Sequence, residues 1–310
     1  MTDLVVAKFG GTSVADFDAM NRSIDVALLD ANTRIVVLSA SAGVTNILVA
    51  LAGGLEPTER FSQLDALRQI QFNILERLRY PNVIREEIER LLENITTLAE
   101  AAALASSTAL TDELVSHGEL MSTLLFVEIL RERGIQAQWF DARKVLRTND
   151  RFGRAEPDIA AVAELTQQQL APRLAEGLVV TQGFIGSEAK GRTTTLGRGG
   201  SDYTAALLGE ALNATASISG PMSRGSILPT RASRRRRNAS TSSPLKRLRK
   251  WPPLAPKCCI RQPCCLPCAA ISRCLSVPVK SLKRAVRWCV KPPRTRRCSA
   301  RWRCVAGKRC

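Results

Sequence analysis

Short apolar runs that end in glycine-rich turns alternate with longer amphipathic segments near the start of the chain. The apolar run at 4–9 ends in Gly-Gly-Thr-Ser and is followed by an amphipathic segment at 16–29. A second apolar run at 34–39 is followed by a Ser-Ala-Gly turn and by a helical pattern over 44–51. Each of these units has the pattern of a strand, a tight turn and a helix.

Helical periodicity dominates the next part of the chain, from 59 to 130. It is broken near Pro81 and at 106–111, so it predicts three long helices. Residues 111–113, Thr-Asp-Glu, are expected to supply the cap and the first-turn acids of the third helix.

Strand-like runs return at 135–140 and 177–182, with a helical segment at 158–175 between them. Strands that alternate with helices predict an α/β fold, here an incomplete three-layer α/β/α sandwich with a mainly parallel sheet. In such folds ligands bind at the carboxyl ends of the strands. The glycine-rich turns at those ends are therefore where we expect the functional residues.

The composition changes abruptly after residue 215. Residues 216–310 hold 25 of the 45 Lys and Arg residues, all ten Cys and no Asp or Glu, whereas residues 1–215 carry a net charge of −8. The second part also holds eleven of the fifteen Pro and lacks Phe and Tyr, so it offers little apolar surface and much charge repulsion. We expect a folded domain at 1–215 and a disordered, basic, Cys- and Pro-rich tail at 216–310.

The tail cysteines show no disulfide or metal-binding pattern. Only Cys265 and Cys268 have zinc-knuckle spacing, no matching second pair follows, and the one histidine, His117, is far away in the sequence. We therefore expect no metal site. A polycation binds nucleic acid without specificity at low salt, so a basic nucleic-acid-binding protein is the alternative interpretation of the tail, with no specific nucleic acid as partner.

The start of the chain has no basic signal-peptide region, and no apolar run reaches 18 residues. We therefore expect neither secretion nor a membrane partner, and a cytoplasmic location.

The first candidate site is the Lys-Phe-Gly-Gly-Thr-Ser-Val segment at 8–14. Lys8 stands at the end of the first strand, and Gly10 and Gly11 form the following turn. Glycines let backbone amides approach an anion closely, and a lysine offers a compact positive charge to phosphate oxygens. The segment is neither Gly-x-Gly-x-x-Gly nor a Walker motif, so its residues alone leave an anion-binding turn and a mere tight turn equally open.

The second candidate site is the polar, glycine-rich segment at 193–203, which we expect to be a turn that runs into a helix from Thr204. Arg198 can hold a carboxylate in a bidentate fork, and Ser201 can donate a hydrogen bond. Asp202, at a helix start, can orient a lysine or a metal-bound phosphate. An exposed Ser- and Thr-rich loop is the alternative, although a parallel sheet would bring this segment close to the first site.

Four motifs in this order resemble those of the aspartokinase family, within the amino-acid kinase fold. They are Lys-Phe-Gly-Gly-Thr-Ser-Val at 8–14, Ser-Ala-Ser-Ala-Gly-Val-Thr at 39–45, Ser-His-Gly-Glu at 116–119 and Gly-Arg-Gly-Gly-Ser-Asp at 197–202. The resemblance extends to about residue 215. The sequence between the motifs is most similar to the lysine-sensitive, monofunctional type.

The resemblance implies transfer of the ATP γ-phosphate to the β-carboxylate of L-aspartate, with Mg²⁺. ATP would be bound by Lys8, Phe9, Gly10 and Gly11, and Lys8 and Asp202 would be catalytic, with Asp202 orienting the lysine. A carboxylate with a pKa near about 4 is already ionised at neutral pH, so the reaction requires no general base. Catalysis then consists of aligning two anions and neutralising their charge.

The resemblance also implies the residues that hold aspartate: Thr45, Glu119, Arg198, Gly199, Gly200 and Ser201. Glu119 would face the amino group and Arg198 the α-carboxylate. A solvated helix acid is the alternative for Glu119. For His117 we favour a structural role.

The tail does not contain the family's next segment, Trp-Thr-Asp-Val-Pro-Gly-Ile-Tyr-Thr-Thr-Asp-Pro, which holds the nucleotide base and ribose. The codons of residues 220–231, regrouped one base upstream, can nevertheless encode all of it. With the same shift, codons 251–261 can encode Met-Ala-Thr-Phe-Gly-Ala-Lys-Val-Leu-His-Pro, another family segment. We hypothesise that one nucleotide was lost near codon 215 and that the tail is out-of-frame translation.

On this hypothesis the chain lacks the second half of the nucleotide site and the family's regulatory domains, and we expect it to be inactive. The intact family is commonly a homodimer. A fused homoserine dehydrogenase, as in bifunctional relatives, would not fit in the available length.

Overall fold

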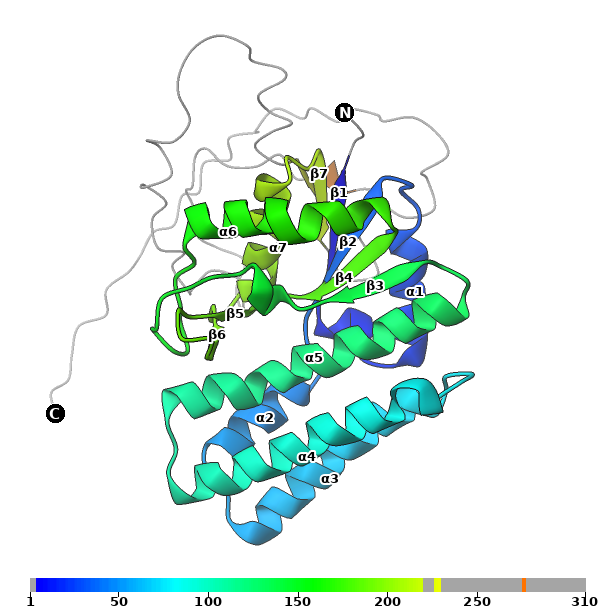
Figure 1. Ribbon diagram of the computed structural model, residues 1–310. Helices are drawn as coiled ribbons and strands as arrows, with labels where there is room; N and C mark the ends of the chain where they lie inside the picture. Colours follow the sequence, from blue (N-terminus) through cyan, green and yellow to red (C-terminus); the bar gives the residue numbers. More distant parts are fainter. Residues whose placement is uncertain (1–3, 220–225, 230–274, 277–310) are drawn as a thin grey trace, which may run out of the picture.

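The computed structural model describes residues 4–219, 226–229 and 275–276 (Figure 1). Its elements in the first half are β1 (Val5–Phe9), η1 (Gly11–Val14), α1 (Phe17–Ala27), β2 (Thr33–Leu38), α2 (Val44–Ala52), α3 (Pro57–Leu75), α4 (Asn82–Leu104) and α5 (Thr108–Glu132). They continue with β3 (Ala137–Phe140), η2 (Ala142–Lys144), α6 (Ile159–Leu165), η3 (Thr166–Leu170), η4 (Ala171–Ala175), β4 (Leu178–Gln182), β5 (Ile185–Ser187), β6 (Thr193–Thr195), α7 (Gly200–Ala211), β7 (Ala216–Ser219), β8 (Ser226–Pro229) and β9 (Leu275–Ser276).

The main sheet has the order β3-β4-β2-β1-β7-β8-β9. The first five strands in this order are parallel to one another, and β8 and β9 are antiparallel to their neighbours. Lys8, near the end of β1, lies opposite Val37 of β2 and Ser219 of β7. The mainly parallel sheet predicted from the alternation of strands and helices is confirmed.

Helices cover both faces of this sheet. Successive strand residues point to opposite faces, so Val6 and Ile35 pack with Ala205 and Leu208 of α7, while Phe9 and other strand residues join a core formed with α1, α2, α4 and α5. Figure 1 shows α6 and α7 on one side of the sheet and α1 and α5 on the other. The predicted three-layer sandwich is confirmed.

The three long helices predicted between 59 and 130 are α3, α4 and α5, but the cap predicted at 111–113 was wrong. The N-cap of α5 is Ser107, whose side chain accepts a hydrogen bond from Leu110 N at 3.1 Å. A serine in an extended conformation can satisfy a free first-turn amide, so the helix begins there. Asp112 lies farther along the helix and is buried.

The helix predicted at 158–175 is irregular. Asp158 caps α6 by accepting hydrogen bonds from Ala160 N and Ala161 N. The chain then passes through a π turn and a 3-10 turn that contains Pro172. Proline has no amide hydrogen to donate to the carbonyl four residues earlier, so a regular helix cannot continue through it.

The glycine-rich segment at 193–203 begins as a strand, not as a turn. Thr193–Thr195 is β6, which pairs antiparallel with β5, and all three of its residues are buried. The following helix, α7, begins at Gly200 instead of at Thr204.

The predicted boundary after residue 215 falls just before β7, which continues the parallel sheet beside β1. Strands pair through backbone groups, so the composition of residues 216–310 gave no indication of β7. Apart from β7, β8 and β9, the predictions made for 216–310, including the disorder and the cysteine pattern, concern residues outside the described part of the chain. No helix among the described residues is long and apolar enough to cross a membrane.

Candidate active site

The turns that follow β1 and β2 are packed against each other. Ala42 N donates a hydrogen bond to Gly11 O at 3.1 Å. A Cβ atom on Gly11 would lie only 2.8 Å from Ala40 O, so this position requires glycine. The predicted turn after β1 is therefore built to bring two backbone segments together, and it places Gly10 and Gly11 next to Lys8.

Lys8 and Asp202 form an ion pair, with Lys8 Nζ 3.0 Å from Asp202 Oδ1. The lysine side chain is only 13% exposed, whereas the aspartate side chain is 58% exposed in the first turn of α7. Lys8 and Asp202 were predicted to be catalytic, and they are in direct contact although most of the domain's sequence lies between them. Among the described residues, no cluster of three His, Cys, Asp or Glu side chains could hold a metal by itself.

Ser201 joins the same group of residues through the turn after β2. Ser39 Oγ donates a hydrogen bond to Ser201 Oγ at 3.0 Å. Gly183, after β4, approaches closely as well: a Cβ atom there would lie 2.6 Å from Ser201 Cβ. The carboxyl ends of β1, β2 and β4 therefore meet at the start of α7, as expected for a parallel sheet.

Phe184 has a left-handed backbone conformation, with φ 72°. This conformation is strained for a bulky residue and is held by the Phe184 amide, which donates to Thr204 Oγ1 at 3.1 Å. Its ring lies against Gly200, where a Cβ atom would be 2.9 Å from the ring. Neither Phe184 nor the contact made by Ser39 was predicted from the sequence. Ser39 stands in a recognised motif, but no sequence signal marks the conformation of Phe184.

Glu119 of α5 is buried at the same end of the sheet. Ala40 N donates a hydrogen bond to Glu119 Oε1 at 3.1 Å, and Oε2 has no hydrogen-bond partner among the described residues. Exclusion of water raises the pKa of Glu119 from 4.5 to about 8. The alternative of a solvated helix acid is wrong, and the unpartnered oxygen is available to a ligand that carries a hydrogen-bond donor.

The other residues predicted to bind ligands differ in their surroundings. Thr45 is half-buried in the first turn of α2. Arg198 is exposed, and no ion pair or hydrogen bond of its side chain occurs among the described residues. Gly199, with φ +81°, caps α7, and Gly200 is buried behind it. Phe9 is buried with its ring 6.5 Å from that of Phe126, so its side chain belongs to the core and only its main chain could face a nucleotide.

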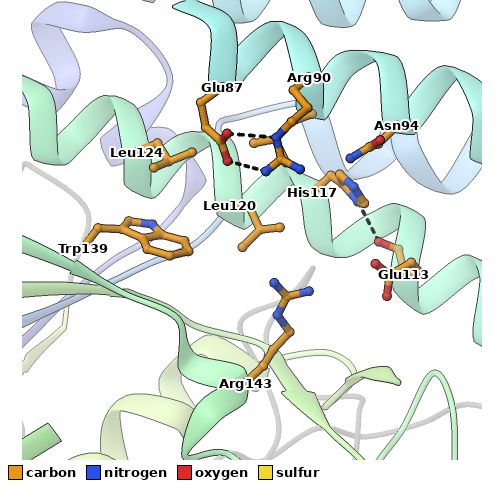
Figure 2. A pocket seen from close by; sticks show the side chains of 10 residues that line it. Glu87, Arg90, Asn94, Glu113, His117, Leu120, Leu124, Trp139 and Arg143 are labelled. Carbon is orange, nitrogen blue, oxygen red and sulfur yellow. Dashed lines mark hydrogen bonds and ion pairs between the residues drawn. The ribbon is translucent and has the colours of Figure 1, made fainter. Parts of the chain in front are cut away.

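His117 projects from α5 toward Asn94 of α4 (Figure 2). It lines a cavity of about 210 Å³ together with residues of α4, α5 and β3 and with Arg143. His117 Nδ1 is 2.9 Å from Glu113 O, and burial lowers the pKa of its ring. His117 is thus buried and bonded to the backbone, as we expect of a histidine with a structural role.

We expect Glu119 to make the folded chain less stable as the pH rises. The folded chain keeps the Glu119 proton up to about pH 8, whereas an unfolded glutamic acid loses it near 4.5. Because the folded state binds more protons in this range, the free energy of unfolding falls from about pH 4.5 to 8, by roughly 5 kcal/mol at most from this group, and levels off above.

The measurement is urea unfolding of the wild type and of Glu119→Gln between pH 5 and 9. Glutamine has nearly the same shape and does not titrate, so the difference in unfolding free energy between the two proteins isolates Glu119. A difference that does not change between pH 5 and 8 would show that the carboxyl group is not protonated in the folded chain.

The chain is similar to known proteins over the part that carries this site. Residues 3–219 match the amino acid kinase family. Over 215 residues, 69% of this chain and 48% of the relative, the sequence is 83% identical to lysine-sensitive aspartokinase 3 of Escherichia coli K12. An aspartokinase of Chlamydia muridarum is 32% identical over 211 residues, which cover 66% of this chain and 45% of the relative.

A crystal structure of E. coli aspartokinase III in complex with aspartate and ADP superposes with a TM-score of 0.70 at 82% identity. The superposition covers 70% of this chain and 48% of that one. The chain thus spans about half the length of the curated relatives it matches.

Proposed function

This chain belongs to the amino acid kinase family, and on that premise we propose that it carries the aspartate- and phosphate-binding part of an aspartate kinase, which transfers the γ-phosphate of ATP to the β-carboxylate of L-aspartate. The observation that carries the proposal is the buried Glu119 carboxylate, with one unpartnered oxygen, at the same sheet end as the Lys8–Asp202 ion pair. The similarity to an aspartokinase whose structure holds aspartate and ADP supports it.

Aspartate binding follows from three kinds of group. The ammonium group of aspartate supplies the donor that Glu119 Oε2 lacks. Arg198, exposed and without a described partner, receives the α-carboxylate in a bidentate contact. Thr45 and Ser201 contribute hydroxyl groups, and Gly199 and Gly200 keep the loop close to the substrate. The β-carboxylate then points toward Lys8.

The phosphates of ATP bind beside the turn after β1. Gly10 and Gly11 leave the backbone open to a close approach, and Lys8 offers a largely buried positive charge whose position is set by Asp202. The N-terminus of α7 has no side-chain cap, so its positive end is available to an anion. Mg²⁺ bound with the nucleotide would neutralise further phosphate charge, and the exposed carboxylate of Asp202 would face it.

The chemistry is a displacement at phosphorus. An oxygen of the ionised β-carboxylate bonds to the γ-phosphorus as the bond to the β,γ-bridging oxygen breaks, giving an acyl phosphate and ADP. No proton moves in this step, which agrees with the surroundings of the one histidine, His117, since it lines a separate cavity. Lys8 lowers the barrier by stabilising the charge on the transferring group.

We expect the purified chain to bind L-aspartate saturably in isothermal titration calorimetry. Arg198→Ala should weaken this binding by roughly tenfold to a hundredfold, because a charge-assisted bidentate contact is lost. Arg79→Ala, which removes an arginine that stacks on Tyr80 far from the site, is the control and should leave affinity unchanged.

Succinate provides a second control because it is aspartate without the amino group. It should bind much more weakly, since Glu119 would keep an unpartnered oxygen. If the wild type does not bind aspartate, or binds succinate equally well, the proposed site is wrong.

The homodimer implied by the resemblance and the cytoplasmic location expected from the start and the apolar runs of the sequence stay predictions; light scattering and fractionation of cells check them. No observation favours the nucleic-acid-binding alternative for the tail. The proposal that residues 216–310 are out-of-frame translation, and that the chain is therefore inactive, concerns mostly residues outside the described part. It is tested through the coding DNA.

A further inference from the structure

Asp112 is a buried carboxylate whose described hydrogen-bond donors all come from outside its own helix. It is 2% exposed in α5. Its Oδ2 accepts hydrogen bonds from Gly153 N and Thr195 N, both at 2.8 Å, and its Oδ1 accepts one from Thr195 Oγ1 at 2.8 Å. Burial raises the pKa of Asp112, and these donors oppose the rise. A buried carboxylate is costly unless donors surround it, so this arrangement holds its partners firmly.

The partners of Asp112 are the segments that shape the loop at 196–199. Thr195 is the last residue of β6, three positions before Arg198. The two partner segments are also joined to each other, since Ala155 N donates to Thr195 O at 2.8 Å. Leu196 N in turn donates to Phe184 O at 2.9 Å. Asp112 therefore fixes the point from which the loop leaves the sheet.

The same face of α5 carries Glu119. Asp112 and Glu119 are seven residues apart, which is about two turns or about 10 Å along the helix axis. One rigid helix thus contacts the turn after β2 through Glu119 and the end of β6 through Asp112. The distance between the two proposed aspartate contacts, Glu119 and Arg198, depends on both connections.

We propose that Asp112 is a positioning residue for aspartate: it sets the Arg198 loop at the right distance from Glu119 without touching the substrate. The expected effect on aspartate affinity rests on the proposed function, but the hydrogen bonds between Asp112 and the loop can be tested without substrate. If Asp112 only stabilised α5, its substitution would change hydrogen exchange in the Arg198 loop no more than in the rest of the domain.

Two substitutions separate the effect of the hydrogen bonds to the loop from the effect of the negative charge of Asp112: Asp112→Asn and Asp112→Ala. In Asp112→Asn the amide oxygen can still accept from Gly153 N and Thr195 N, and the amide nitrogen can donate to Thr195 Oγ1. Asp112→Ala removes all three contacts. Ser107→Ala is the matched control, because it removes the N-cap of the same helix without touching the loop.

Hydrogen–deuterium exchange of the full chain, followed by mass spectrometry, tests the connection directly. Asp112→Ala should speed exchange about tenfold or more in peptides that cover 150–156 and 193–200, because the Gly153 and Thr195 amides lose their acceptor. Asp112→Asn should exchange like the wild type in these peptides. Ser107→Ala should speed exchange in the first turns of α5 and leave the loop unchanged.

Calorimetric titration with L-aspartate tests the consequence. Asp112→Ala should weaken binding by roughly tenfold, and Asp112→Asn should restore affinity to within about threefold of the wild type. If Asp112→Ala does not fold, Thr195→Val, which removes only the hydroxyl contact, replaces it and should weaken binding at least about threefold.

The outcomes distinguish this inference from the proposed function. A wild type that fails to bind aspartate refutes the function and the positioning role built on it, while the exchange data still report whether Asp112 holds the loop. Unchanged loop exchange and unchanged affinity in Asp112→Ala, or in Thr195→Val where it is the replacement, overturn the inference. An equal loss of affinity in Asp112→Asn and Asp112→Ala would also overturn it. In that case Asp112→Asn would keep the hydrogen bonds to the loop and still fail to bind aspartate as the wild type does.

Discussion

Insertion of one nucleotide near codon 215 is expected to turn a chain without aspartate-dependent ATP turnover into an active aspartate kinase. The described residues supply Lys8, Glu119 and Arg198, and the sheet already continues through β7 beside β1. What the chain lacks, as translated, is the family segment that binds the nucleotide base and ribose. The insertion would change the residues at 216–219, which form β7 in this chain, and would place that segment directly after them.

The expected change is from no detectable turnover to a rate on the order of 1–100 per second, the usual range for kinases. The measurement is ADP release, coupled to NADH oxidation, with and without L-aspartate. Lys8→Ala in the frame-restored protein is the control and should lose roughly a hundredfold to a thousandfold in rate, because an electrostatic contact to the transferring phosphate is removed.

Two results would contradict the out-of-frame hypothesis. One is a stop codon soon after the insertion, where the hypothesis requires a long open reading frame. The other is that the unmodified 310-residue chain turns over ATP as fast as the frame-restored protein, since its residues 216–310 would then be functional as they stand.

Glu119→Gln is expected to weaken L-aspartate binding by roughly a hundredfold. A desolvated carboxylate that pairs with an ammonium group contributes strongly to affinity, and glutamine offers only a neutral oxygen in the same place. Glu113→Gln is the matched control, because Glu113 lies on the α5 face that lines the His117 cavity and not on the Glu119 face. Calorimetric titration of both variants and of the wild type measures the effect.

The pH dependence provides a second test of the same residue. In the free chain Glu119 is largely protonated below its pKa of about 8, and binding of the ammonium group requires the ionised form. Wild-type affinity should therefore rise by up to about tenfold per pH unit from pH 6 toward 8 and then level off, with release of a proton on binding. Glu119→Gln should show neither effect. A wild-type affinity that is constant from pH 6 to 8 would mean that Glu119 is already ionised or does not contact aspartate.

Much of the fold could be predicted from the sequence because periodicity reports local backbone structure. Apolar runs located β1, β2, β3 and β4, and breaks near Pro81 and Ser107 separated the three long helices. Glycines after strands marked the turns that form the site. Position in a parallel sheet then implied that Lys8 and the segment around Asp202 would be close, and they are 3.0 Å apart.

The errors occurred where a residue's partners are distant in the sequence. Asp112 follows a threonine, as a first-turn acid of a helix often does. Its three hydrogen-bond donors, however, belong to residues 41 and 83 positions away. The three threonines of β6 look like an exposed loop and are buried by pairing with β5. Local propensity carries no information about either arrangement.

The sequence by itself determined the order of β1 to β4 and of the three long helices, the glycine turns, the abrupt change of composition at residue 215 and the family that the motifs resemble. Only the tertiary structure decided which polar side chains lose contact with water. Glu119 and His117 are two residues apart on one helix, yet one has an unpartnered oxygen at the sheet end and the other lines a separate cavity. Burial and hydrogen-bond partners set the pKa of a side chain, and both depend on segments that meet only when the chain folds.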